Sequence, residues 1–111
     1  MKGLIVKPYW ADLILSGEKS IELRSSNTNI RGRIGIIKSG TKKVYGEADL
    51  VDSREITDEE YYNLVDKHRV NVKREDVSYK KIYAWTLENP VLYKEPKEYD
   101  HKLGCVIWVN L

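Results

Sequence analysis

Three strand-like segments follow one another between residues 20 and 51, with no helical segment between them. Ser20–Ser25 alternates apolar and polar side chains, and the strand-like segments Arg33–Ser39 and Val44–Val51 are separated by a turn at 40–43. A doubly wound α/β fold needs helical crossovers between its parallel strands. Consecutive strands therefore disfavour that fold, and the order predicts an α+β fold.

Two segments have helical periodicity. Pro8 suits the first turn of a helix running to about Leu15, because its missing N–H would be unpaired there, and Ser16-Gly17 ends this helix. A second helix starts after Thr57, where Thr57-Asp58-Glu59-Glu60 fits a capping box, and runs to His68 or Arg69. Further strands are predicted at Gly3–Lys7, Ile82–Leu87 and Cys105–Asn110, the last two separated by an irregular segment that contains Pro90 and Pro96.

The predicted architecture is a small, closed or nearly closed β-barrel of five to six strands with two main helices, because closure removes exposed strand edges. A chain of 111 residues fits one domain, residues 1–111. Cys105 is the only cysteine, which excludes an intramolecular disulfide and points to a reducing compartment. His68 and His101 do not make a metal site, and we expect no metal and no cofactor. The apolar run before Lys7 is too short for a membrane span, so a cytoplasmic protein is expected.

Charge is unevenly distributed along the chain. Residues 1–43 hold nine Lys or Arg and three Asp or Glu, residues 44–66 hold one and eight, and residues 67–111 hold nine and six. If the two basic segments fold side by side, their positive face would attract polyanions such as RNA. Segments this mildly charged are also typical of an ordinary solvated surface.

Residues 17–24, GEKSIELR, bring three charged side chains together. Gly17 allows a left-handed exit from the helix, and the alternation of the following strand places Glu22 and Arg24 on one face, about 7 Å apart. Arginine can bind a phosphate or a base edge, Lys19 supplies a point charge, and Glu22 can accept from an exocyclic amine. A partly buried salt-bridge network that fastens helix to strand would use the same residues.

Further candidates flank these residues. Lys7 ends the first strand beside the helix opening and is a candidate ligand contact. Tyr9 lies off the apolar stripe of the helix and could stack on a base, whereas Trp10 lies on the stripe and is assigned to the core. Each of the polar candidates can also be read as a solvated surface residue. Cations around the ends of one strand could hold phosphates: Arg31, Arg33, Lys42 and Lys43.

The pattern G-x-K-x-x-E-x-R at residues 17–24 resembles the signature of the ASCH domain family, named for activating signal cointegrator homology. The resemblance spans nearly the whole chain and implies a PUA-like β-barrel with a cleft between the first helix and the barrel. It implies no single reaction. Other segments that look like their family counterparts are Lys7-Pro8-Tyr9-Trp10-Ala11, Leu13–Gly17, Arg31-Gly32-Arg33, Tyr83-Ala84-Trp85, Gly104 and Trp108.

The function favoured by this resemblance is a module that binds RNA or a modified nucleoside, with Lys7, Tyr9, Lys19, Glu22, Arg24 and Ser39 as ligand contacts. An amidohydrolase that deacetylates N4-acetylcytidine is an alternative. For such enzymes the resemblance implies three working residues: the lysine of the motif, a threonine three residues further on, and a downstream acid. In this chain the lysine is Lys19, the threonine is replaced by Glu22, and Glu75 or Asp76 is available as the acid. A ribonuclease is a further alternative, with Lys19, a tyrosine such as Tyr9 and a serine such as Ser39.

Overall fold

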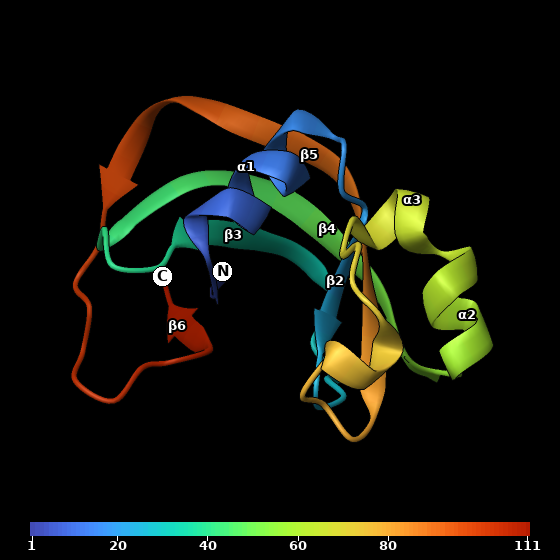
Figure 1. The fold of residues 1–111 in the computed structure, drawn as a ribbon. Coiled ribbons are helices and arrows are strands. Elements are labelled where there is room, and N and C mark those ends of the chain that lie inside the picture. Colours follow the sequence, from blue (N-terminus) through green and yellow to red (C-terminus); the bar gives the residue numbers. More distant parts are fainter.

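The computed structural model describes residues 1–111 as one curved sheet of six strands, with the helices beside it (Figure 1). The α+β class is as predicted, and none of the helices is long and apolar enough to cross a membrane. In chain order the elements are β1 (Lys2–Val6), α1 (Pro8–Ser16), β2 (Ile21–Arg24), β3 (Gly32–Lys38), β4 (Lys43–Ile56), α2 (Asp58–Asn63), α3 (Val65–His68), the 3₁₀ turn η1 (Arg74–Asp76), β5 (Ile82–Glu98) and β6 (Trp108–Asn110).

The sheet is not a closed barrel, which corrects the prediction from the sequence. Its strand order is β2-β5-β4-β3-β1-β6, with β1 and β3 parallel and every other pair antiparallel. The two edge strands, β2 and β6, have four and three residues and do not pair with each other. Such short edges offer few unpaired backbone groups, so exposure is limited without closure.

Strands β4 and β5 are longer than predicted, with 14 and 17 residues. The segment around Pro90 and Pro96, predicted to be irregular, belongs to β5. Asp49 pairs with Glu88 and Glu47 pairs with Val91, so Pro90 falls at a shift of register, and Pro96 falls at another. A proline has no N–H to donate to a neighbouring strand. Both prolines lie where the pairing of β4 and β5 is interrupted, and the antiparallel pairing resumes after each of them in a new register.

Two other predicted elements are shorter in the structure. The last strand contains only Trp108–Asn110, and Cys105 lies in the turn before it rather than in a strand. The second helix is divided into α2 and α3 at Leu64, whose ψ of 12° departs from helical geometry. Its predicted start is confirmed, because the Thr57 hydroxyl accepts from the Glu60 N–H and the Glu60 carboxylate accepts from the Thr57 N–H.

The hydrophobic core has a large part under α1 and a smaller part under α2. The buried face of α1 packs on β3, β4 and β5 through Ala11, Ile14 and Leu15, and Leu4 and Val6 of β1 belong to the same cluster. On the other side of β2, Tyr61 of α2 packs on Ile21, Leu23 and neighbouring residues. Gly17, with φ of 87°, ends α1 and turns the chain toward β2. The charged motif thereby lies between the two parts of the core.

Candidate functional site

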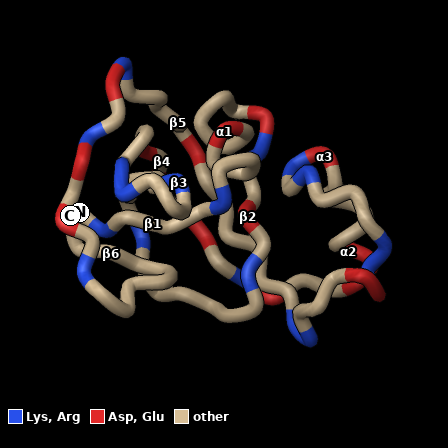
Figure 2. The backbone as a smooth tube through the Cα atoms, turned by 60° about the vertical axis from the view of Figure 1, so that its left-hand side comes forward, with Lys and Arg blue, Asp and Glu red and all other residues tan.

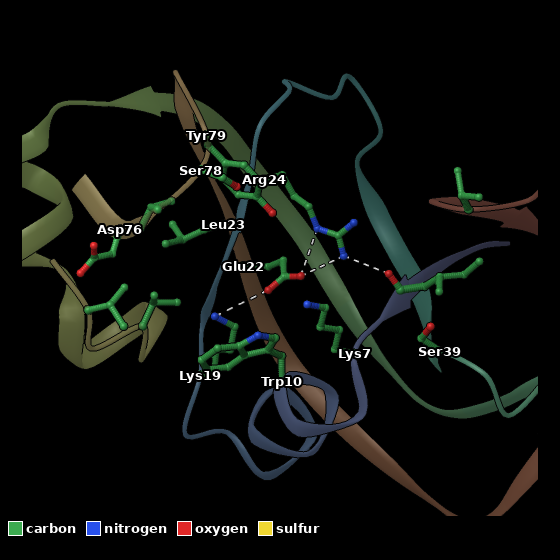
Figure 3. A pocket seen from close by; sticks show the side chains of 15 residues that line it. Lys7, Trp10, Lys19, Glu22, Leu23, Arg24, Ser39, Asp76, Ser78 and Tyr79 are labelled. Carbon is green, nitrogen blue, oxygen red and sulfur yellow. Dashed lines mark hydrogen bonds and ion pairs between the residues drawn. The ribbon is translucent and has the colours of Figure 1, made fainter. Parts of the chain in front are cut away.

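A cavity of about 490 Å³ opens between α1, β2 and the segment 70–79 (Figure 3). Its volume is within the range of small-molecule sites. Five of the six ligand contacts proposed from the sequence line it, and they come from the ends of β1 and β3 and from the motif before and within β2. These residues are Lys7, Lys19, Glu22, Arg24 and Ser39.

Glu22 is the centre of the charged cluster on one side of this cavity. Its Oε2 accepts from Arg24 Nε at 3.0 Å and from Arg24 Nη2 at 2.9 Å, and its Oε1 lies 3.6 Å from Lys19 Nζ. Arg24 Nη2 also donates to the Ile5 carbonyl at 2.9 Å, which connects β2 to β1. The alternation of β2 therefore places Glu22 and Arg24 on one face, as expected.

Lys19 is almost completely buried, with 1% of its surface exposed. Its ammonium group donates to the carbonyl oxygen of His68 and lies 4.5 Å from the centre of the Trp10 ring. Burial lowers the pKa of Lys19 to about 8, and the neighbouring Glu22 carboxylate only partly offsets this effect. Lys19 is therefore a cation at neutral pH that can lose its proton in mildly alkaline solution.

His68 fixes the carbonyl group that receives Lys19. Its Nδ1 accepts from the Val70 N–H at 2.9 Å, and its Nε2 lies 2.6 Å from the Tyr61 carbonyl, so the proton belongs on Nε2. The imidazole stacks on the Tyr61 ring at 4.9 Å, and burial lowers the pKa of His68. His68 thus supports the site as a neutral, buried ring that does not line the cavity.

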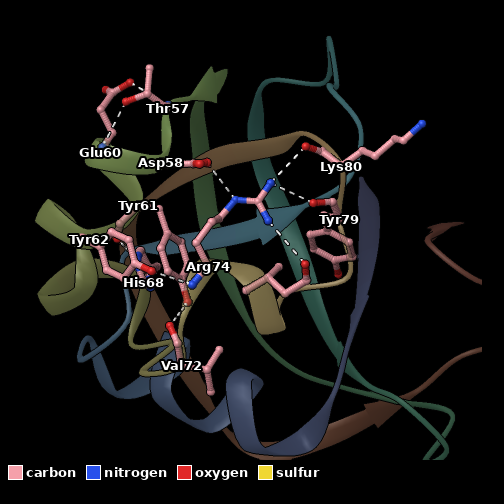
Figure 4. A network of polar contacts seen from close by, with 11 residues as sticks. Thr57, Asp58, Glu60, Tyr61, Tyr62, His68, Val72, Arg74, Tyr79 and Lys80 are labelled. Atoms are coloured by element: carbon pink, nitrogen blue, oxygen red, sulfur yellow. Dashed lines mark hydrogen bonds and ion pairs between the residues drawn. The ribbon is translucent and has the colours of Figure 1, made fainter.

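The wall opposite α1 is formed by residues 70–79, of which the sequence analysis considered only Glu75 and Asp76, as alternatives for a downstream acid. Arg74 fastens this segment (Figure 4): its Nε donates to Asp58 of α2 at 3.0 Å, and its other nitrogens donate to the carbonyls of Val77, Tyr79 and Lys80. The segment has no helical or strand periodicity that could have predicted this position. It contributes Asp76, Ser78 and Tyr79, among other residues, to the cavity.

Tyr9 lies outside the cavity, with 66% of its surface exposed, and its ring contacts the edge of Trp10. Trp10, assigned to the core from the sequence, packs against the core and also lines the cavity. A base-stacking role for Tyr9 therefore receives no support from the position of the cavity.

The four proposed phosphate contacts do not form one cluster. Arg31 and Arg33 lie at the start of β3 and Lys42 and Lys43 lie beyond its end, about 20 Å away for a seven-residue strand. Arg33 is neutralised by Glu47 and Asp49 on β4. The acidic start of α2 lies on the opposite side of the molecule from β1 and β6 (Figure 2). Lys42 lines a second cavity next to the first.

Comparison with known proteins agrees with this architecture. The family model of the ASCH domain matches residues 4–106. The crystal structure of ASCH from Zymomonas mobilis superimposes with a TM-score of 0.70 at 20% identity, covering 87% of this chain and 72% of that one. The structure of a serine-to-alanine variant of ASCH from the same organism gives a TM-score of 0.72 at 19% identity, covering 99% of this chain and 87% of that one. The structure of a tyrosine-to-phenylalanine variant gives a TM-score of 0.65 at 20% identity, covering 87% of this chain and 74% of that one. No curated protein matches the sequence.

Proposed function

Because the chain belongs to the ASCH domain family, whose fold is PUA-like, we propose that the cavity beside α1 binds a base of single-stranded RNA or a modified nucleoside. The observation that carries this proposal is the set of polar groups at the cavity. A buried Lys19–Glu22–Arg24 cluster on one side still offers hydrogen bonds to a ligand, and an unpaired lysine, Lys7, lies beside it.

The walls of the cavity suit a nucleobase. Trp10, Tyr79 and several valines give apolar and aromatic surface against which the faces of a planar base can pack. Arg24 Nη1 makes no hydrogen bond within the protein, and Glu22 Oε1 has only the 3.6 Å contact with Lys19. Arg24 therefore offers a donor and Glu22 an acceptor to the hydrogen-bonding groups of a base.

The charges around the cavity distinguish a phosphate side from a base side. Lys19 and Arg24 share the Glu22 carboxylate, whereas Lys7 forms no ion pair and points into the cavity beside Glu22 (Figure 3). Asp76 is on the opposite wall and would repel a phosphate. A nucleotide would therefore place its phosphate near Lys7 and its base between Arg24 and the segment 70–79.

Lys7→Ala tests this proposal. We expect the variant to bind a labelled mixed-sequence RNA octamer about 3–10-fold more weakly than the wild type, and the slope of log affinity against log salt to fall by about one. Lys7 makes no side-chain bond at the start of α1, so the fold should be unaffected. Fluorescence anisotropy at several salt concentrations measures both quantities.

The matched control is Lys67→Ala, which removes the same charge from an exposed position on α3 where alanine is a good helix former. Its affinity should equal that of the wild type. Equal losses in the two variants would show that binding depends only on net charge, and the absence of salt-dependent RNA binding by the wild type would reject the proposal.

A second candidate, the deacetylation of N4-acetylcytidine, is favoured by the lowered pKa of Lys19, about 8, in a group 3.6 Å from Glu22. The neutral amine could take a proton from the water that attacks the acetyl carbonyl, giving cytidine and acetate. Turnover should therefore rise as the pH increases through about 8. Asp76 lines the cavity and Glu75 does not. For the ribonuclease alternative, Tyr9 lies outside the cavity that contains Lys19 and Ser39.

Chromatographic detection of cytidine tests this candidate. Lys19→Arg keeps a cation but cannot supply a neutral base, so it should release no cytidine, while Lys7→Ala should remain active. Circular dichroism checks that both variants fold. No cytidine from the wild-type protein at any pH between 7 and 9 would reject the hydrolase and leave the binding function.

A further inference from the structure

A second cavity, of about 240 Å³, lies directly beside the first, and three residues line both: Ile5, Ser39 and Val106. The second cavity is formed by the turn after β3 and by residues 99–106. The Ile5 N–H donates to the Ile107 carbonyl at 2.9 Å, which fastens this segment beside β1. The two cavities are therefore neighbouring compartments that meet at Ser39.

The side chains of the second cavity suit a nucleotide. Tyr99 and His101 supply aromatic rings, which contact each other at 5.6 Å between centres, and the Tyr99 hydroxyl lies 2.7 Å from His101 Nδ1. Lys42 supplies a cation, and no Asp or Glu lines this cavity. An aromatic wall with an unopposed positive charge is the combination that holds single-stranded nucleic acid.

Lys42 has an unusual backbone position. Its φ of 57° lies in the left-handed region, where a residue with a side chain is uncommon. The neighbouring Thr41 hydroxyl donates to the Lys38 carbonyl at 2.7 Å and accepts from the Lys43 N–H at 3.2 Å, which holds the turn. The fold thus keeps an unpaired lysine at a position that would favour glycine.

The residues where the cavities meet match a phosphodiester linkage. Ser39 makes no side-chain hydrogen bond within the protein, although its N–H donates to the Val6 carbonyl at 2.8 Å. Its hydroxyl is therefore free to donate to a phosphate oxygen. Lys7 in the first cavity and Lys42 in the second both lack an ion pair. One serine flanked by two available cations suits the single negative charge that joins two nucleosides.

We propose that the second cavity binds the nucleotide next to the one held in the first, so that the ligand is single-stranded RNA of at least two nucleotides rather than a free nucleoside. This inference rests on the proposed function of the first cavity. It assigns Lys42, Tyr99 and His101 to the added nucleotide and Ser39 to the linking phosphate.

The test compares mixed ribonucleoside monophosphates with mixed-sequence ribodinucleotides, followed by NMR titration of backbone amides. We expect the wild type to bind the dinucleotides at least tenfold more tightly. Lys42→Ala and His101→Ala should each weaken dinucleotide binding by at least threefold and leave mononucleotide binding unchanged. Both residues are outside the first cavity, and Lys67→Ala again serves as the charge control.

The outcomes separate the two proposals. If mononucleotides bind but dinucleotides bind no more tightly, or if Lys42→Ala and His101→Ala bind dinucleotides as the wild type does, the second site is rejected while the proposed function stands. If neither mononucleotides nor dinucleotides bind, the proposed function fails and the second site fails with it. Amide shifts at residues 99–106 that appear only with dinucleotides would support the second site.

Discussion

Replacing Glu22 with alanine is expected to lower the free energy of unfolding by about 3–5 kcal/mol, the loss typical of breaking a buried ion pair. Glu22 is 5% exposed, and its carboxylate is shared by Lys19 and Arg24. Without it, Lys19 is a buried cation with no carboxylate partner, and Arg24 loses its ion pair. Removal of Glu22 also removes the attraction that raises the pKa of Lys19, so this pKa should fall further below about 8.

Urea unfolding measures this effect, with Asp12→Ala as the control. Asp12 also pairs with a lysine, Lys38, at 2.6 Å, but its side chain is 64% exposed. Exposed pairs contribute little, so the control should lose less than about 1 kcal/mol. If the free energy of unfolding fell no more in Glu22→Ala than in Asp12→Ala, the cluster would contribute nothing to stability. Ligand binding would then be the only role left for Glu22.

The sequence left two interpretations of Lys19, Glu22 and Arg24: a salt-bridge network or a nucleotide site. The structure shows that the two are compatible, because the network forms one side of the cavity. A Glu22 variant would therefore change stability and binding together. Lys7 and Lys42, which have no ion pairs, are the sharper probes of ligand contact, since their removal leaves no buried charge behind.

The parts of the site that were predictable depend on local pattern or on the family resemblance. The period of two in β2 places Glu22 and Arg24 on one face. Lys7 and Ser39 lie close together because β1 and β3 are parallel, with Val6 opposite Lys38. The residues that follow the two strands are therefore at the same end of the sheet. The first relation can be read from a few neighbouring residues. The parallel pairing of β1 and β3 was not predicted, and the place of Ser39 at the site was implied by the family resemblance.

The parts that were missed depend on contacts distant in sequence. The segment 70–79 is polar and aperiodic, and its position is set by Arg74 and by the Tyr61 hydroxyl, which donates to the carbonyls of Val70 and Val72. The length of β5 was missed because prolines normally end a strand, whereas here Pro90 and Pro96 fall at shifts of register. Closure of the sheet was expected because it removes exposed strand edges. Here the edge strands β2 and β6 are so short that few backbone groups are exposed without closure.

Arg74→Ala is expected to release the wall of the first cavity. The substitution removes an ion pair with Asp58 and the donors to the Val77, Tyr79 and Lys80 carbonyls. Losing bonds from a charged donor should lower the free energy of opening this segment by about 2–4 kcal/mol. The Asp76 and Val77 amides, which donate to Lys73 and Arg74 carbonyls, should then exchange with deuterium about 30-fold faster or more.

Two further variants separate this role from a general effect of charge. Arg74→Lys keeps the cation but has no planar fork to reach three carbonyls, so it should show most of the increase in exchange. Arg54→Ala removes a half-exposed arginine that pairs with Glu60 and should leave residues 70–79 protected. Because residues 70–79 form one wall of the cavity, RNA affinity should fall in Arg74→Ala and Arg74→Lys together. Faster exchange with unchanged RNA affinity would mean that the ligand does not contact this wall, and the base would then have to lie between α1 and β1.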